Sequence, residues 1–128
     1  MSSPLKIMVV DDEPDVQFLF QLEFNNEISE NRMQFHFAIS GREAMEFFTV
    51  NDPADLCLIL SDINMPEMDG LTLLDKLKSK YPDLKVCMVT AYGDEEIRNK
   101  AEKLGCDDYV TKPINFSDLR NKIYSLAV

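Results

Sequence analysis

The sequence lacks residues that several classes of site need. Histidine occurs once, at His36, and the three cysteines (Cys57, Cys87 and Cys106) form no Cys-x-x-Cys pair. Catalytic triads and zinc sites therefore have little to build on. We expect the thiols to be small, buried, apolar-like side chains in a reducing compartment. His36 lies between two phenylalanines, which favours a strand position that faces solvent.

Long apolar runs are also missing. No stretch approaches the roughly 20 apolar residues that span a bilayer, and the first residues carry neither the basic nor the apolar region of a signal peptide. We therefore expect a cytoplasmic protein with no membrane partner. Linkers, repeats and low-complexity tracts are absent, and 128 residues fit one domain, so we expect a single domain over residues 1–128.

Basic residues are the minority among the charged side chains. Lysine and arginine together number 13 against 23 aspartates and glutamates, which gives a formal net charge of −10. Nucleic acid phosphates would repel such a chain, so we expect no direct binding to DNA.

What the sequence contains is a short apolar run followed by an amphipathic one, repeated along the chain. The apolar runs predict strands at residues 5–10, 33–39, 56–60, 86–89 and 109–111. The amphipathic runs predict helices at residues 14–24, 40–48, 71–81, 94–104 and 115–126. Five strands alternating with five helices predict an α/β fold, with a parallel sheet and helices on both faces.

Local signals support several of these boundaries. Ser40 and Asn115 are placed to cap helices, and Gly105 to end one. The first helix carries an apolar stripe made of Val16, Leu19, Phe20 and Phe24. Residues 25–32 are polar and predict a loop.

Polar side chains follow four of the predicted strands at the point where each strand ends. Asp11 and Asp12 follow the first strand, and Asp62 follows the third. Thr90 and Lys112 follow the fourth and fifth. Because the carboxyl ends of parallel strands meet at one edge of the sheet, we expect these side chains to converge there.

This predicted cluster has a definite chemistry. Three neighbouring carboxylates repel one another unless a cation lies among them. Oxygen ligands in an open, hydrated site suit Mg²⁺. Asp62 can act as a carboxylate nucleophile toward phosphorus. Phosphoryl transfer needs charge neutralised around three equatorial oxygens, and Mg²⁺, Lys112 and Thr90 can each serve one.

Each of these residues also has a simpler interpretation. Asp11 and Asp12 could be the acidic residues that favour a helix N-terminus, and Asp62 could form a turn. Thr90 could be an ordinary hydroxyl at a strand end. These interpretations are independent of one another, whereas the functional one explains why all the residues fall at one edge in order.

At this point the sequence resembles the response regulator receiver family across essentially its whole length. The resemblance rests on four motifs, each of which closes a predicted strand: Val9-Val10-Asp11-Asp12-Glu13-Pro14, Asp62-Ile63-Asn64-Met65-Pro66-Glu67-Met68-Asp69-Gly70, Val89-Thr90-Ala91 and Tyr109-Val110-Thr111-Lys112-Pro113. It implies a flavodoxin-like, doubly wound sheet with strand order 2-1-3-4-5.

The resemblance implies roles for the residues of the cluster. Asp62 would be the phosphoacceptor, and Mg²⁺ would be held by Asp12 directly, by Asp11 through water and by the backbone carbonyl of Asn64. Lys112 would pair with the phosphoryl group, and the peptide that joins it to Pro113 would be cis.

The same resemblance implies a switch. Thr90 would move toward the phosphoryl group, and Tyr109 would turn inward with it. Asn64 and Tyr92 occupy positions that tune hydrolysis of the acyl phosphate in this family. The protein would catalyse its own phosphorylation and dephosphorylation, rather than act as an enzyme on another substrate.

Partners follow from these roles. A sensor histidine kinase or a histidine phosphotransfer protein would donate the phosphoryl group. The altered surface would lie over residues 94–104, 109–111 and 115–126, including Glu95, Ile97, Arg98, Tyr109 and Asp118. It would bind a downstream target protein, a covalently linked output domain or a second copy of the chain. We expect a stand-alone regulator, with the amino-terminal piece of a longer protein as the alternative.

Four other functions can be compared with the sequence. A flavin-binding protein of this topology needs a glycine- and hydroxyl-rich loop where Asp11 and Asp12 stand. An EF-hand calcium loop beginning at Asp62 needs glycine where Glu67 stands. An aspartyl-phosphate phosphatase needs a second aspartate where Asn64 stands. The fourth, a receiver-fold interaction module that works without phosphorylation, stays open.

Overall fold

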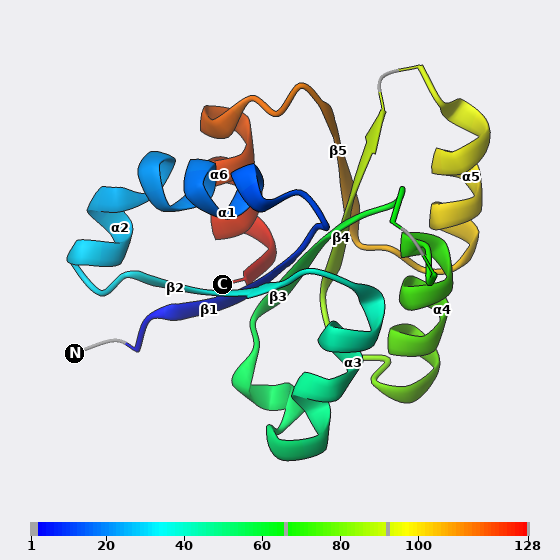
Figure 1. The fold of residues 1–128 in the computed structure, drawn as a ribbon, viewed down its shortest axis with the longest axis horizontal. Coiled ribbons are helices and arrows are strands. Elements are labelled where there is room, and N and C mark those ends of the chain that lie inside the picture. Colours follow the sequence, from blue (N-terminus) through cyan, green and yellow to red (C-terminus); the bar gives the residue numbers. More distant parts are fainter. Residues whose placement is uncertain (1–2, 66, 92, 128) are drawn as a thin grey trace.

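The computed structural model describes residues 3–65, 67–91 and 93–127, and these residues form a five-stranded parallel sheet flanked by helices (Figure 1). The strands are β1 (Leu5–Val10), β2 (Met33–Ala38), β3 (Leu58–Asp62), β4 (Val86–Ala91) and β5 (Asp108–Lys112).

The strand order is β2-β1-β3-β4-β5, which confirms the predicted doubly wound topology. The chain passes from β1 outward to β2 and then returns to the other side of β1 with β3. The direction of winding therefore reverses between β1 and β3, where Val10 lies beside Ser61 in register. In open sheets of this kind, ligands bind at the carboxyl ends of the two strands that flank this reversal.

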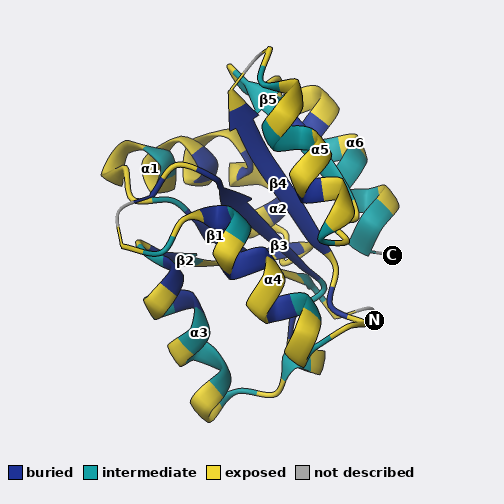
Figure 2. Cartoon of the chain, turned by 90° about the vertical axis from the view of Figure 1, so that its right-hand side faces the viewer, coloured by how far each residue is buried: buried dark blue, intermediate teal, exposed yellow. Residues whose placement is uncertain are grey.

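The central strands are apolar because helices cover both of their faces. β3 is buried along its whole length, and β4 is buried up to its last residue (Figure 2). The edge strands are more exposed, since β2 is buried only at its two end residues and β5 only at Val110.

Helices form a layer on each face of the sheet. The helices are α1 (Pro14–Glu23), α2 (Asn25–Ser29), α3 (Gly41–Val50), α4 (Gly70–Lys80), α5 (Glu95–Lys103) and α6 (Phe116–Ala127), with a 3-10 turn η1 at Pro53–Asp55. One core cluster joins the sheet to α3, α4 and α5, and a second joins it to α1 and α6. None of the helices described is long and apolar enough to cross a membrane.

Several helix ends follow the local chemistry of the sequence. Ser40 accepts a hydrogen bond from the Glu43 amide at 3.0 Å, and Asn115 accepts one from the Asp118 amide at 3.1 Å. Gly105 follows α5 with a φ of 93°, the left-handed conformation that glycine adopts at no steric cost. These three predicted helix boundaries are confirmed.

The prediction of a loop over residues 25–32 is wrong, because α2 occupies the first part of this segment. Its polar composition hides one anchoring residue, Glu27, which is 4% exposed. The Glu27 carboxylate accepts a hydrogen bond from Nε of Arg120 in α6 at 2.6 Å. The helix is thus stabilised by a partner 93 residues away, which no local pattern reveals.

Two predictions of burial also need correction. Phe20 of α1 and Phe24, which follows its last residue, enter the core, whereas Leu19 is 43% exposed and lies on the outward side with Phe18 and Leu22. The residues that pack on the sheet are spaced four apart, at positions 16, 20 and 24, and Leu19 lies off that face.

Of the three cysteines, only Cys87, in the central strand β4, is buried. Cys57 and Cys106 lie just outside β3 and β5 and are half-buried, because they precede the fully covered part of the sheet. His36 is exposed on the edge strand β2, as predicted, and packs on Phe47.

Candidate functional site

Three carboxylates meet at the edge of the sheet where the winding reverses. Asp11 and Asp12 follow β1, and Asp62 is the last residue of β3. Each offers one oxygen, and these oxygens all lie within 4.8 Å of one another. Such a set of hard oxygen donors fits a divalent cation of the Mg²⁺ class.

Two of these side chains are shielded from water. The side chains of Asp11 and Asp62 are 8% and 6% exposed. Burial raises the pKa of Asp11, and the nearby Asp62 carboxylate raises it further. The Glu13 amide opposes these effects by donating a hydrogen bond to Asp11 Oδ1 at 2.9 Å. The site thus concentrates negative charge that a cation would relieve.

Lys112 supplies a positive charge to the same cluster. Its Nζ lies 3.4 Å from Asp62 Oδ2 and 3.8 Å from Asp11 Oδ2. Lys112 is the last residue of β5, and the peptide that joins it to Pro113 is cis, as predicted. The lysine therefore reaches from the edge strand β5 to the carboxylate that follows β1 and to the one that ends β3.

The main chain at Asp62 is held from two directions. Ser61 donates a hydroxyl hydrogen bond to the Asp62 carbonyl oxygen at 3.0 Å. The Gly70 amide, at the start of α4, donates to the carbonyl oxygen of Ile63 at 2.7 Å. A Cβ atom on Gly70 would clash with the Asp62 carbonyl oxygen and would lie 2.7 Å from the Ile63 Cα atom. Only glycine lets the helix approach the strand end this closely.

Thr90 lies in the neighbouring strand at the same edge. Asp62 is beside Val89 in the register of β3 with β4, so Thr90 is one residue farther along. It is 2% exposed, and its Oγ1 atom has no hydrogen-bond partner within the part of the chain that the structure describes. An unpaired buried hydroxyl costs free energy, so this group gains from a new acceptor.

Tyr109 occupies β5 beside Met88 and packs partly against the core on the side of α3, α4 and α5. Met88 and Thr90 lie two residues apart in β4 and therefore on one face of the sheet. Arg98 of α5 stacks on the Tyr109 ring, with its guanidinium carbon 3.9 Å from the ring centroid.

The structure thus brings together most of the residues predicted from the sequence. Asn64 lies two residues beyond Asp62, exposed in the loop before α4. Tyr92 lies outside the described residues. Ser61 and Gly70 also hold the site, although the sequence pattern assigns no role to either residue. Gly70 was visible in an Asp-Gly pair at a helix start, but Ser61 had no such signal, since its partner is a main-chain atom.

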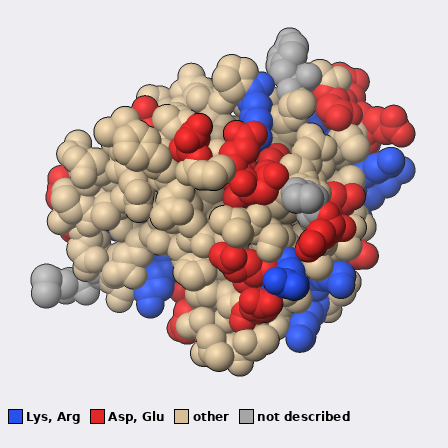
Figure 3. Space-filling view, viewed as in Figure 1, with Lys and Arg blue, Asp and Glu red and all other residues tan. Residues whose placement is uncertain are grey.

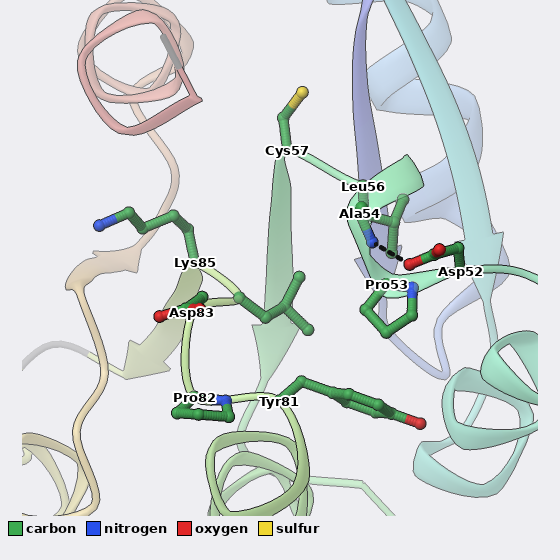
Figure 4. Close-up of a pocket in the computed structure, with 10 residues that line it drawn as sticks. Asp52, Pro53, Ala54, Leu56, Cys57, Tyr81, Pro82, Asp83 and Lys85 are labelled. Atoms are coloured by element: carbon green, nitrogen blue, oxygen red, sulfur yellow. Dashed lines mark hydrogen bonds between the residues drawn. The ribbon is translucent and has the colours of Figure 1, made fainter.

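A separate cavity of about 340 Å³ lies at the opposite end of the strands (Figure 4). It is formed by residues before β3 and before β4, including Pro53, Tyr81 and Pro82. The Cys57 side chain points away from Tyr81 in this view. Asp62 ends β3 at the other edge, so this cavity is no part of the acidic site.

The acidic charge of the chain extends beyond the site. Figure 3 shows groups of aspartates and glutamates mainly in the middle and on the right of the face seen in Figure 1, with lysines and arginines among them.

Comparison with known proteins gives one consistent result. The sequence matches the family model described as the response regulator receiver domain over residues 7–124. The response regulator protein PilR of Pseudomonas aeruginosa is 32% identical over 118 residues, which are 92% of this chain and 25% of PilR. Sporulation initiation phosphotransferase F of Bacillus subtilis is 29% identical, and the match covers 92% of this chain and 90% of that protein.

Solved structures agree with the sequence matches. The receiver domain of the Francisella response regulator 1452 has a TM-score of 0.82 at 28% identity, with 96% of each chain covered. The chain spans about a quarter of the length of relatives such as PilR and the regulatory protein AtoC of Escherichia coli.

Proposed function

This chain belongs to the response regulator receiver domain family, and from that premise we propose that Asp62 accepts a phosphoryl group in a Mg²⁺-dependent reaction. Acceptance of a phosphoryl group and dependence on Mg²⁺ are general in the family. The observation that carries the proposal is the convergence of three carboxylates and Lys112 at the edge where the sheet winding reverses.

Asp62 is the nucleophile in this proposal. One carboxylate oxygen attacks the phosphorus of a phosphohistidine, the new O–P bond forms as the N–P bond breaks, and the electron pair of the broken bond leaves with the imidazole. The main-chain contacts of Ser61 and Gly70 hold the attacking group in place.

The charge of the transferred group is met by two side chains of the protein. The Lys112 ammonium, already 3.4 Å from Asp62 Oδ2, neutralises one phosphoryl oxygen. The Thr90 hydroxyl, which is otherwise unpaired among the described residues, donates a hydrogen bond to another phosphoryl oxygen. A movement of Thr90 toward that oxygen would displace the end of β4. The displacement would then reach Tyr109, which lies on the same face of the sheet as Thr90.

Asp11, Asp12, Asp62 and the backbone carbonyl of Asn64 would hold Mg²⁺. The metal ion, when bound, lowers the repulsion among the carboxylates and offsets negative charge on the phosphoryl oxygens. Asp11 would gain from this relief, because burial and the nearby Asp62 carboxylate raise its pKa.

The partners in this proposal are a histidine kinase or a histidine phosphotransfer protein upstream and a target protein or output domain downstream. The match to sporulation initiation phosphotransferase F, a phosphotransferase by name, supports the transfer chemistry. The surface that responds would be formed by α5, β5 and α6, and a second copy of the chain is another candidate for binding it.

The test is intact-mass spectrometry after incubation with acetyl phosphate, with Mg²⁺ or with EDTA. We expect one phosphoryl adduct that requires Mg²⁺ and is absent from Asp62→Asn. Glu46→Gln is a matched control, because it also replaces a carboxylate with an amide but lies on the exposed side of α3. If neither the wild type nor the control gains an adduct in a time course from seconds to hours, an interaction module that works without phosphorylation replaces this proposal.

A further inference from the structure

The side chain of Tyr109 is held by a cation from the helix beside it. The Arg98 guanidinium carbon lies 3.9 Å from the ring centroid, and Arg98 Nη2 donates a hydrogen bond to the Tyr109 hydroxyl. One arginine therefore binds both the aromatic face and the polar tip of the tyrosine.

A second cation fixes the strand on which Tyr109 lies. Lys122 of α6 pairs with Asp108 at 2.9 Å, and its Nζ lies 6.0 Å from the Tyr109 ring centroid. The neighbouring Asp108 carboxylate accepts a hydrogen bond from the Tyr109 amide at 2.8 Å. Tyr109 is thus connected to α5 through its own side chain and to α6 through Asp108.

The contact with Arg98 is made at a cost. Arg98 Nε is buried and has no hydrogen-bond partner among the residues described. An unpaired buried donor costs free energy, so the guanidinium group would gain free energy by forming a hydrogen bond through Nε with another partner. Arg98 can therefore stabilise the observed position of Tyr109 and still release it.

We propose that Arg98 is a latch on Tyr109, which opposes its turn toward Thr90 and so sets how readily the α5–β5–α6 surface changes. The inference rests on the proposed function, since it concerns regulation of the same switch. Thr90, Met88 and Tyr109 share one face of the sheet. A turn of Tyr109 toward Thr90 requires its ring and hydroxyl to leave Arg98. The contacts with Arg98 therefore lower the population of the turned state.

The experiment follows Tyr109 directly by ¹⁹F NMR of the protein labelled with 3-fluorotyrosine. The sequence has four tyrosines, and the spectrum of Tyr109→Phe identifies the signal of Tyr109. The proteins compared are the wild type, Arg98→Gln and Arg98→Lys, each with and without beryllium fluoride and Mg²⁺ as the phosphoryl analogue. The rate at which acetyl phosphate adds a phosphoryl group is measured on the same samples.

The matched control is Lys100→Gln, which removes the same charge from an exposed position of α5. We expect Arg98→Gln, without the analogue, to move the Tyr109 signal in the direction that the analogue moves it in the wild type. Its phosphorylation rate should rise about five-fold, as expected for loss of one cation–π contact. Arg98→Lys should recover part of both effects, and Lys100→Gln should match the wild type.

Two other outcomes are distinct. A Tyr109 signal and a phosphorylation rate in Arg98→Gln equal to those of the wild type would overturn the latch and leave the proposed function intact. The absence of any phosphoryl adduct in the wild type and all variants would overturn the proposed function instead.

Discussion

Gly70 brings the first turn of α4 against the strand end that carries Asp62. The glycine makes this contact through its main chain, so no side-chain chemistry reveals its importance. A Cβ atom at this position meets the main chain at Asp62 and Ile63, which cannot move without moving the proposed phosphoacceptor. The position of Asp62 therefore depends on a residue that carries no charge and no reactive group.

Replacing Gly70 with alanine should lower the free energy of unfolding by about 1–3 kcal/mol and slow phosphorylation by acetyl phosphate about ten-fold or more. Urea unfolding and timed mass spectra measure the two effects. Gly105→Ala is the control, because its nearest neighbour is a flexible Lys78 carbon at 3.9 Å, far from the site. It should lose stability, because its φ of 93° disfavours a side chain, and should keep its phosphorylation rate. Equal phosphorylation rates in the two variants would contradict this account.

The cysteines differ in burial, and their reactivity should follow it. Burial raises the pKa of Cys87 to about 12, and burial also raises the pKa of Cys106. Because the thiolate is the reactive form, iodoacetamide should modify the half-buried Cys57 fastest and Cys106 more slowly, and it should leave Cys87 untouched in the folded protein. Peptide mapping after labelling, with a urea-unfolded sample as the control, measures this. Labelling of Cys87 at the rate of Cys57 in the folded protein would contradict the structure.

At the scale of elements, contacts made by Arg120 connect α6 to α2 and to the end of α1. Arg120 of α6 donates hydrogen bonds to the Glu27 carboxylate at 2.6 Å and to the Glu23 carbonyl oxygen at 2.9 Å, and it lies over the Phe24 ring. Burial alone would raise the pKa of Glu27, but the hydrogen bond and charge of Arg120 outweigh it and lower that pKa. The carboxylate form of Glu27 is therefore the form that stabilises the fold.

Replacing Glu27 with glutamine should lower the free energy of unfolding at neutral pH by about 1–3 kcal/mol, the contribution of a hydrogen bond to a charged group. Because the folded-state pKa is depressed, this contribution is fully present above the ordinary glutamate value of 4.5 and is lost as the pH falls through the folded value. The difference in the free energy of unfolding between the wild type and Glu27→Gln should then disappear at acid pH, as measured by urea titrations.

The control for this change is Glu46→Gln, which removes an exposed carboxylate paired with Arg42 one helical turn away. It should change stability little, because exposed ion pairs contribute little. A gap between wild type and Glu27→Gln that stays constant down to acid pH would show that the pair with Arg120 is not its source.

For the whole molecule, the sequence predicts the parts that obey a local period or a strand-end rule. Alternating apolar and amphipathic runs predict the α/β fold, and the polar residues at strand ends predict the cluster around Asp62. Contacts between segments far apart leave no such pattern. The pair of Glu27 with Arg120 spans 93 residues, and the stacking of Arg98 on Tyr109 depends on how α5 sits over β5, so both required the structure.

The most direct test of the account is to locate the phosphoryl group on the chain. Wild-type protein is phosphorylated with acetyl phosphate and Mg²⁺ and then reduced with sodium borohydride, which converts an aspartyl phosphate into homoserine. The digested protein is sequenced by tandem mass spectrometry. The account predicts homoserine at position 62, only after phosphorylation and only with Mg²⁺. Homoserine at another aspartate, or an adduct that borohydride does not reduce, would contradict it.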